Sequence, residues 1–371
     1  MSKVKNVNPM TISELRTAIP LNGAELTYVI QSEPGCGKTS LLSMIAEDHG
    51  DKWRSPRDGY NIEGDKYDYI YVDCPVKDMS DIGMVIPNHE TKTLEYYVAS
   101  LFNLKSPKPK VVCLDEFMKS PKLLQVVFTR LMLERMVGDD PLPRGSILFA
   151  TSNNASDGVG DSMLAHAGNR VCIVPMAKPT PNEWLEWASE NNISRIIRAW
   201  VALFPRCLAS YTDGNQDDNP YIFNPSKPQL SFCSPRSLAK SDVIVRNREK
   251  MTENSVMTSL SGTIGASAAA DMSAFLSLEK TLVDVKDILK DPDGIKVPDE
   301  ISAQLMIMFQ AIDTLEDQEQ LTKFMKFVER IKNAEIQAVF FTMMMRNSRT
   351  VRLARNNAKI AEWAKNNHDL F

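Results

Sequence analysis

One short segment constrains the fold more than any other part of the chain. Residues 32–39 read Ser-Glu-Pro-Gly-Cys-Gly-Lys-Thr, follow the apolar run 26–30 and precede the helix-forming run 40–45. Glycines in a tight turn between a strand and a helix allow backbone conformations that other residues rarely adopt. The backbone N–H groups of such a turn, together with the positive end of the helix dipole, bind phosphate. The segment therefore predicts a phosphate-binding loop in a nucleotide-binding α/β sheet.

Two side chains of this loop carry the chemistry expected of a nucleotide site. Lys38 would reach the β- and γ-phosphates, and the hydroxyl of Thr39 would ligate Mg²⁺. Ser32 departs from the usual pattern, which has glycine at that position, and the alternative interpretation is an ordinary glycine-rich turn. The strand before the loop and the helix after it favour the nucleotide site. The predicted ATP-binding residues are Glu33, Pro34, Gly35, Cys36, Gly37, Lys38, Thr39 and Ser40.

An acidic pair follows a second apolar run. Residues 111–114 are uninterrupted apolar residues, typical of a strand covered on both faces, and Asp115 and Glu116 come directly after them. Parallel strands present their carboxyl ends at one edge of a sheet, so Asp115 should emerge beside the phosphate loop. Asp115 would then hold Mg²⁺ with Thr39, and Glu116 would orient and polarise the attacking water. The alternative is that this pair simply begins a loop.

Strands alternate with helices in the first half of the chain, and the strand signal disappears after about residue 177. This alternation predicts a parallel sheet with right-handed crossovers. The predicted fold class is α/β, a P-loop NTPase sheet followed by an all-helical region. The predicted domains are 1–177, which binds nucleotide, and 178–371, which is helical. The predicted strands are 26–31, 67–73, 111–114, 146–151 and 171–174.

Helices and loops are predicted for the rest of the chain from capping, periodicity and proline. A capping box at 11–14 opens a helix that should stop at Pro20. Loops are expected over 50–66, 78–87 and 209–231. The apolar residues of 81–87 either bind a partner or tuck under the following helix. Residues 182–187 are predicted to open a helix after Pro181. The other predicted later helices are 38–48, 94–104, 121–136, 193–204, 235–247, 266–278, 280–290, 300–314, 317–332, 334–346 and 356–367.

Composition restricts the class of protein. The 371 residues are 43% hydrophobic and 24% charged, as in ordinary globular proteins, and the net charge of -4 gives no electrostatic footprint for nucleic acid. The six cysteines are scattered, which indicates reduced thiols, and the four histidines lack metal-ligand spacing. We find neither a signal-type apolar core nor a run long enough to span a bilayer. We therefore expect a cytoplasmic protein without a membrane segment.

These motifs together resemble those of AAA+ ATPases, and specifically the MoxR-like branch found in bacteria and phages. Residues 33–39 resemble the Walker A loop of that family, and Leu114-Asp115-Glu116 resembles its Walker B motif. The strand ending at Asn153 resembles the sensor 1 segment, with Asn154 as the alternative sensor. The resemblance covers most of residues 25–290. It implies an AAA+ αβα core followed by a helical lid.

Two arginines gain roles from the same resemblance. Asn169-Arg170-Val171 is similar to the element whose arginine acts in a neighbouring subunit's site, although Val171 replaces an aromatic residue. Arg236 lies in Ser-Pro-Arg-Ser, which resembles the sensor 2 entry of the lid helix. An arginine aimed at the γ-phosphate stabilises charge on the transferring group. The rival residues for action in a neighbouring site are Arg130, Arg135 and Arg144.

The leading hypothesis is a Mg²⁺-dependent ATP hydrolase that works as a homo-oligomeric ring, most simply a hexamer, and remodels a partner protein. The resemblance further implies a von Willebrand factor A-type protein as that partner. The first alternative is a nucleic-acid-handling ATPase of the helicase or clamp-loader type, against which the acidic net charge counts. The second is a scaffold that binds ATP without turnover, which would not need Glu116.

Overall fold

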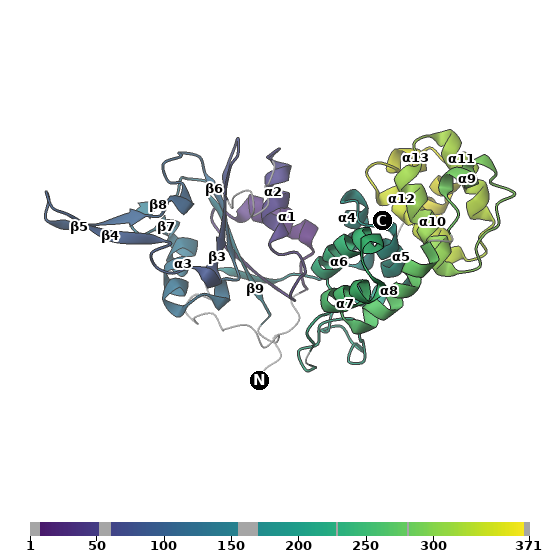
Figure 1. The fold of residues 1–371 in the computed structure, drawn as a ribbon. Helices are drawn as coiled ribbons and strands as arrows, with labels where there is room; N and C mark the ends of the chain where they lie inside the picture. The colour runs from purple at the N-terminus through teal and green to yellow at the C-terminus, as the bar shows by residue number, and fades with distance from the viewer. Residues whose placement is uncertain (1–7, 52–60, 155–169, 228, 280–281, 367–371) are drawn as a thin grey trace. The chain divides into compact units, whose positions relative to one another are not determined.

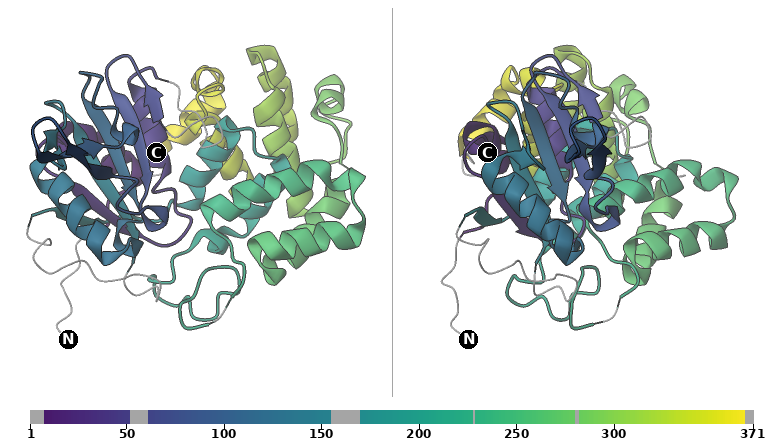
Figure 2. Two further views of the ribbon diagram at one scale, coloured as in Figure 1. Left: turned by 60° about the vertical axis from the view of Figure 1, so that its left-hand side comes forward. Right: turned by 90° about the vertical axis from the view of Figure 1, so that its left-hand side faces the viewer.

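The computed structural model describes residues 8–51, 61–154, 170–227, 229–279 and 282–366. The chain divides into two compact units, Met1–Lys178 and Pro179–Phe371. We describe each unit by itself, with the first referred to as the α/β unit and the second as the helical unit (Figures 1 and 2).

The α/β unit is built on a six-stranded sheet in the order β10-β1-β9-β6-β3-β2. All neighbouring pairs are parallel except β2 with β3. This order confirms the predicted fold class, an α/β unit with a mainly parallel sheet followed by a helical unit. The short antiparallel strand β2 lies in a stretch that was predicted to be a loop. The strands are β1 Tyr28–Ser32, β2 Asn61–Glu63, β3 Asp68–Asp73, β6 Lys110–Asp115, β9 Ile147–Asn153 and β10 Cys172–Pro175.

Helices cover both faces of this sheet (Figure 1). On one face, α1 (Ile12–Asn22) and α2 (Ser40–Asp48) pack their apolar residues against those of β1, β3, β6 and β9. On the other face, α3 (Lys122–Glu134) packs against the same strands through a second core. Every residue of β6 and β9 is buried, as the uninterrupted apolar runs predicted. The result is a three-layer sandwich that fixes the carboxyl ends of the central strands.

The segment between β3 and β6 differs from the prediction. The expected loop 78–87 and helix 94–104 form instead an antiparallel hairpin of β4 (Gly83–Asn88) and β5 (Thr93–Val98), followed by a 3-10 turn, η3 (Ser100–Phe102). The hairpin projects from the sheet in Figure 1. Its strands are rich in Thr, Tyr, Val and Ile, which suit a pleated surface better than a helix. The helix prediction here is wrong, and with it the idea that 81–87 tucks under that helix.

The remaining elements of the α/β unit are small. Helix α1 continues through Pro20 to Asn22 instead of stopping at the proline. A second short hairpin joins β7 (Met136–Val137) to β8 (Asp140–Pro141). Two further 3-10 turns follow the carboxyl ends of β3 and β6, namely η2 Cys74–Val76 and η4 Phe117–Lys119.

The described part of the helical unit consists of helices packed on one apolar core, plus the isolated bridge Ile222–Cys233. Helix α7 was not predicted, because its Ser- and Thr-rich sequence has weak helix propensity. Its Val256, Leu260 and Ile264 nevertheless recur at helical spacing and are buried. The helices are α4 Pro181–Glu190, α5 Arg195–Leu203, α6 Pro235–Asn247, α7 Glu253–Ile264, α8 Ala266–Glu279, α9 Val285–Lys290, α10 Ile301–Thr314, α11 Gln318–Glu329, α12 Ala334–Arg346, α13 Val351–Arg355 and α14 Ala358–Asn366, with 3-10 turns η6 Pro205–Leu208 and η7 Arg248–Lys250.

Several predicted helices are shorter than expected, including two in the last third of the chain. The one predicted over 280–290 is α9, and residues 280–281 lie outside the described residues. The one predicted over 356–367 is α14, which runs from Ala358 to Asn366. Across the described ranges, we find no helix with the length and apolarity to cross a bilayer.

Candidate nucleotide-binding site

The phosphate loop connects β1 to α2 at the carboxyl edge of the sheet. Gly35 and Gly37 have positive φ angles of 78° and 95°, a region that favours glycine. A Cβ added at Gly37 would meet only Ile12 Cδ1 at 3.6 Å, so its need for glycine comes from the backbone angle rather than from crowding. Ser32 is the last residue of β1 and is not among the residues with positive φ. A side chain is therefore compatible with the position where the common pattern has its first glycine.

Lys38 is held over the loop by oxygen acceptors. Its Nζ donates to the carbonyl oxygens of Ser32 at 2.9 Å and Glu33 at 3.0 Å, and to Asn153 Oδ1 at 3.1 Å. It also donates to the Ser32 hydroxyl at 3.1 Å, which gives this unusual loop residue a direct contact with the lysine that is predicted to bind phosphate. Lys38 is 7% exposed and Asn153 is 6% exposed. The structure thus brings Asn153 to the phosphate loop from the neighbouring strand β9.

Asp115 lies at the centre of a set of hydroxyl donors. Its carboxylate accepts hydrogen bonds from Thr39 Oγ1 at 3.1 Å, from Tyr71 OH at 2.8 Å and from Thr151 Oγ1. Sequence analysis identified Thr39 but missed Tyr71 and Thr151. Tyr71 lies two residues before the end of the predicted strand 67–73, and Thr151 is the last residue of the predicted strand 146–151; their strands flank β6 in the sheet. The available signal was the alternation of side chains along strands, because the register places Tyr71 and Thr151 on the same face of the sheet as Asp115.

These oxygen donors fit Mg²⁺. Mg²⁺ is bound by one or two protein oxygens, with phosphate oxygens and water completing its shell. Asp115 and Thr39 supply a carboxylate and a hydroxyl whose oxygens already lie 3.1 Å apart. Within the described ranges, no cluster of three or more His, Cys, Asp or Glu side chains could hold a metal alone. The donor set is thus that of a metal bound together with a nucleotide.

Glu116 has an unusual backbone conformation. Its φ of 50° and ψ of 37° place it in the left-handed region, which costs free energy for a residue with a side chain. Its N–H donates to Thr151 Oγ1 at 3.0 Å, and its carboxylate pairs with Lys119 Nζ at 2.7 Å. The carboxylate is partly exposed, next to the carboxyl edge of the sheet. Burial raises the pKa of nearby Asp73, and the charges of Asp115 and Glu116 raise it further.

A buried ion pair closes one side of the loop. The Glu33 carboxylate lies 3.4 Å from Lys178 Nζ, and each side chain is 5% exposed. Burial raises the pKa of the adjacent Cys36 thiol to about 11, an effect that the positive charges of Lys178 and Lys38 oppose. Cys36 is therefore a protonated packing residue at neutral pH. Sequence analysis did not identify Lys178.

The predicted trans-acting arginine, Arg170, lies at the opposite edge of the sheet from the phosphate loop. It is exposed in a bend just before β10, whose residue Cys172 pairs with Tyr28 at the start of β1. The five residues of β1 separate that edge from the loop, a distance of about 15 Å at the usual rise per residue. Arg170 is thus remote from the phosphate loop of its own chain. Asn169, its neighbour in the motif, lies outside the described residues.

The other candidate arginines have different surroundings. Arg135 donates to the backbone oxygen of Gly23 at 3.0 Å and to Thr27 Oγ1 at 2.7 Å, and burial lowers its pKa. These contacts give Arg135 a structural role at the amino edge of the sheet. Arg130 pairs with Glu134 on α3, and Arg144 is exposed before β9. Arg236 is exposed in the first turn of α6 in the helical unit.

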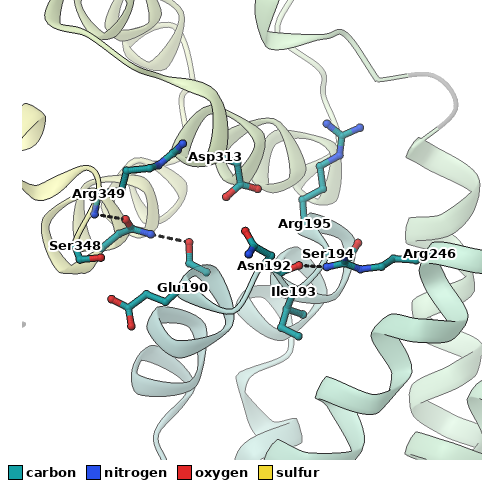
Figure 3. Close-up of a pocket in the computed structure, with 11 residues that line it drawn as sticks. Glu190, Asn192, Ile193, Ser194, Arg195, Arg246, Asp313, Ser348 and Arg349 are labelled. Atoms are coloured by element: carbon teal, nitrogen blue, oxygen red, sulfur yellow. Dashed lines mark hydrogen bonds between the residues drawn. The ribbon is translucent and has the colours of Figure 1, made fainter. Parts of the chain in front are cut away.

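The helical unit contains a separate pocket of about 440 Å³ (Figure 3). It is bounded by Arg195, Arg246 and Arg349 together with acidic Glu190 and Asp313. Within its wall, Asn347 Nδ2 donates to Ser189 Oγ at 2.8 Å. No predicted site residue lines it, so it is not part of the candidate nucleotide site.

Comparison with known proteins gives only distant structural matches. No family model and no curated protein matches the sequence. Among solved structures, a Cytophaga hutchinsonii protein assigned as an ATPase is 14% identical, with a TM-score of 0.32 over 71% of this chain and 88% of that chain. The Thermotoga maritima RuvB Holliday junction branch migration motor is 14% identical, with a TM-score of 0.34 over 84% and 85%. NtrX from Brucella abortus is 13% identical, with a TM-score of 0.32 over 97% and 66%. Structural similarity at this level does not indicate the function of this chain. The function is therefore inferred from the residues of the candidate site.

Proposed function

We propose that this protein is a Mg²⁺-dependent ATP hydrolase. One observation carries the proposal: four side chains lie at one edge of the sheet, beside a loop in which two glycines have positive φ angles. These residues are Lys38, Thr39, Asp115 and Glu116. A phosphate loop alone would support binding of a nucleotide. The acidic pair at the end of the adjacent buried strand adds a metal ligand and a water-orienting carboxylate.

Each residue has a defined task in this proposal. Lys38 exchanges its present oxygen acceptors for the β- and γ-phosphates, while Asn153, now bonded to Lys38, becomes available to the attacking water. Thr39 and Asp115 hold Mg²⁺, which when bound neutralises the charge of the phosphates. Glu116 accepts a hydrogen bond from water and aligns it with the γ-phosphate. Tyr71 and Thr151 keep the Asp115 carboxylate oriented.

We further propose that hydrolysis requires assembly into a ring, with a hexamer as the simplest case. An arginine near the γ-phosphate stabilises the transition state, and Arg170 is remote from the loop of its own chain. Arg170 can stabilise the transition state only if it reaches the nucleotide site of a neighbouring copy of the chain. Arg236 would contact nucleotide from the helical lid. In this proposal the protein is a MoxR-like AAA+ ATPase that remodels a partner, for which a von Willebrand factor A-type protein is the candidate.

The cysteines support a cytoplasmic location in this proposal. All six are free, and five of them are buried. Free thiols in this number are typical of a reducing compartment.

A Glu116→Gln variant tests the proposal. We expect it to bind Mg²⁺-ATP as the wild type does, while phosphate release falls by about a hundredfold or more, because the water loses its orienting carboxylate. Glu25→Gln, an exposed change on the same unit, is the matched control and should hydrolyse normally. Wild-type turnover by Glu116→Gln would exclude the proposed role of this residue.

The same variant identifies what the ATPase acts on. Affinity capture with Glu116→Gln in ATP, read by mass spectrometry and by a nucleic-acid stain, should enrich one protein. Enrichment of nucleic acid with no protein would overturn the remodelling proposal in favour of a nucleic-acid motor.

A further inference from the structure

A carboxylate inside a phosphate loop requires a counter-charge. Glu33 is the first residue after β1 and is almost fully buried. A bound triphosphate would bring several negative charges close to it, and a buried carboxylate without a cation is strongly unfavourable. Lys178 is the cation that meets it, at 3.4 Å, and is equally buried. Lys38 bonds to the backbone carbonyl oxygen of Glu33, whereas Lys178 pairs with its carboxylate, so the ion pair can persist when Lys38 turns to the phosphates.

Lys178 is also the last residue of the α/β unit. The chain just before it is fixed to the sheet, since Met176 N donates to Gln31 O at 2.8 Å and Ala177 N donates to Met10 O at 2.8 Å. The connection after it is short, because α4 begins at Pro181 with Thr180 as its N-cap. Pro179 and Pro181 both have restricted φ angles, so this connection is stiff as well as short.

We propose that the Glu33–Lys178 ion pair makes the phosphate loop compatible with bound nucleotide and couples nucleotide binding to the connection that leads into the helical unit. This inference rests on the proposed function, since it assigns a regulatory contact to the same site. Lys178 acts as a positioning residue through Glu33 and has no role in the chemical step.

The coupling follows from the position of the two partners. Glu33 belongs to the loop that must wrap the phosphates, and Lys178 begins the only covalent path to α4. Any change in the loop on binding alters the free energy of the ion pair, and therefore the position of Lys178. By linkage, restraint of Lys178 changes nucleotide affinity to the same degree.

The first experiment measures affinity for Mg²⁺ with a non-hydrolysable ATP analogue by isothermal titration calorimetry at fixed ionic strength. Lys178→Gln should weaken binding by about tenfold or more, because it removes a buried positive charge that pairs with Glu33, while the phosphates add negative charge beside that carboxylate. The double variant Glu33→Gln/Lys178→Gln should recover to within about threefold of the wild type, since both charges of this ion pair are then removed together. Lys178→Arg should bind nearly as well as the wild type.

The single variant Glu33→Gln gives a prediction of opposite sign. It removes the negative charge and keeps the positive one, so the analogue should bind more tightly than to the wild type. Because Glu and Gln have the same shape, this variant also tests the inference if Lys178→Gln does not fold. Lys108→Gln, which removes a partly buried lysine bonded to Gly64 O, is the matched control and should leave affinity unchanged.

The second experiment tests the coupling without a measurement of ATP turnover. Hydrogen exchange of the peptide covering 179–190 should change on addition of the analogue in the wild type. In Glu33→Gln/Lys178→Gln that change should be lost although the analogue still binds. A change that persists in the double variant would overturn the coupling.

The affinity results separate two kinds of failure. Three results would overturn the charge pairing and leave the ATPase proposal intact. They are wild-type affinity in Lys178→Gln, a double variant that binds as weakly as Lys178→Gln, and weakened binding in Glu33→Gln. Absence of analogue binding by the wild type would instead overturn the proposed function, and this inference with it.

Discussion

Tyr71→Phe is the most informative test of the metal site, because this residue was found only through the structure. The tyrosine hydroxyl donates to Asp115 at 2.8 Å, and burial together with the charge of Asp115 raises its pKa. Tyr71 therefore stays protonated and remains a donor throughout the working pH range. Substitution by Phe removes one of the three hydroxyls that orient the Asp115 carboxylate.

The expected magnitude follows from that single bond. A hydrogen bond to a charged acceptor contributes about 1.5–3 kcal/mol. Loss of such an outer-shell contact typically weakens metal affinity by about ten- to a hundredfold. We therefore expect the Mg²⁺ concentration for half-maximal ATP turnover to rise by at least about tenfold. The unfolding temperature should fall by about 3–12 °C, the shift that about 1.5–3 kcal/mol produces in a unit of this size.

The same strand provides a matched control. Tyr69 is two residues earlier in β3, and its hydroxyl donates at 3.0 Å to Asp51, which is not part of the proposed site. Tyr69→Phe removes a comparable buried hydroxyl and should leave the Mg²⁺ dependence unchanged. An unchanged Mg²⁺ dependence in Tyr71→Phe, or an equal shift in both variants, would refute the reasoning.

Two further predictions concern assembly and stability. Arg170→Ala should bind ATP yet hydrolyse it at least about a thousandfold more slowly, and mixing it with Glu116→Gln should restore part of the activity. No recovery in the mixture would argue against action between subunits. Lys110→Met should lower the free energy of unfolding of the α/β unit by about 3–5 kcal/mol. The reason is that Lys110 Nζ forms a buried ion pair with the Asp68 carboxylate at 2.5 Å, and the variant leaves that carboxylate buried without the lysine charge. Lys110→Met/Asp68→Leu should recover most of that loss in a denaturant titration, and a Lys110→Met variant as stable as the wild type would contradict the account.

The parts of the site that sequence analysis predicted are those set by local patterns. The phosphate loop needs left-handed glycines between a strand and a helix, and the buried strand before Asp115 is recognisable from four apolar residues alone. Parallel topology then places both at one edge of the sheet. Asn153 was predicted from the family resemblance alone, and the position of its strand β9 between β1 and β6 accounts for its contact with Lys38.

The missed parts depend on contacts across the sheet or on competition between local preferences. Tyr71, Thr151 and Lys178 acquire their roles from neighbours that are distant in sequence, and no local pattern specifies those pairs. Strand β5 falls mostly in the stretch 94–104, which was predicted as a helix and whose apolar residues recur at roughly helical spacing, whereas most of β4 was predicted as a loop. Pairing with Gly83–Asn88 favours the extended form, and the backbone N–H of Glu90 donates to Asn88 Oδ1 in its turn.

The central claim is that the loop between β1 and α2 binds the phosphates of a nucleotide through Lys38. Titration of Mg²⁺ and a non-hydrolysable ATP analogue into the wild type and Lys38→Ala, with exposed Lys122→Ala as control, tests it directly. We predict saturable binding by the wild type and by Lys122→Ala, and no measurable binding by Lys38→Ala. Undiminished affinity in Lys38→Ala would contradict the account.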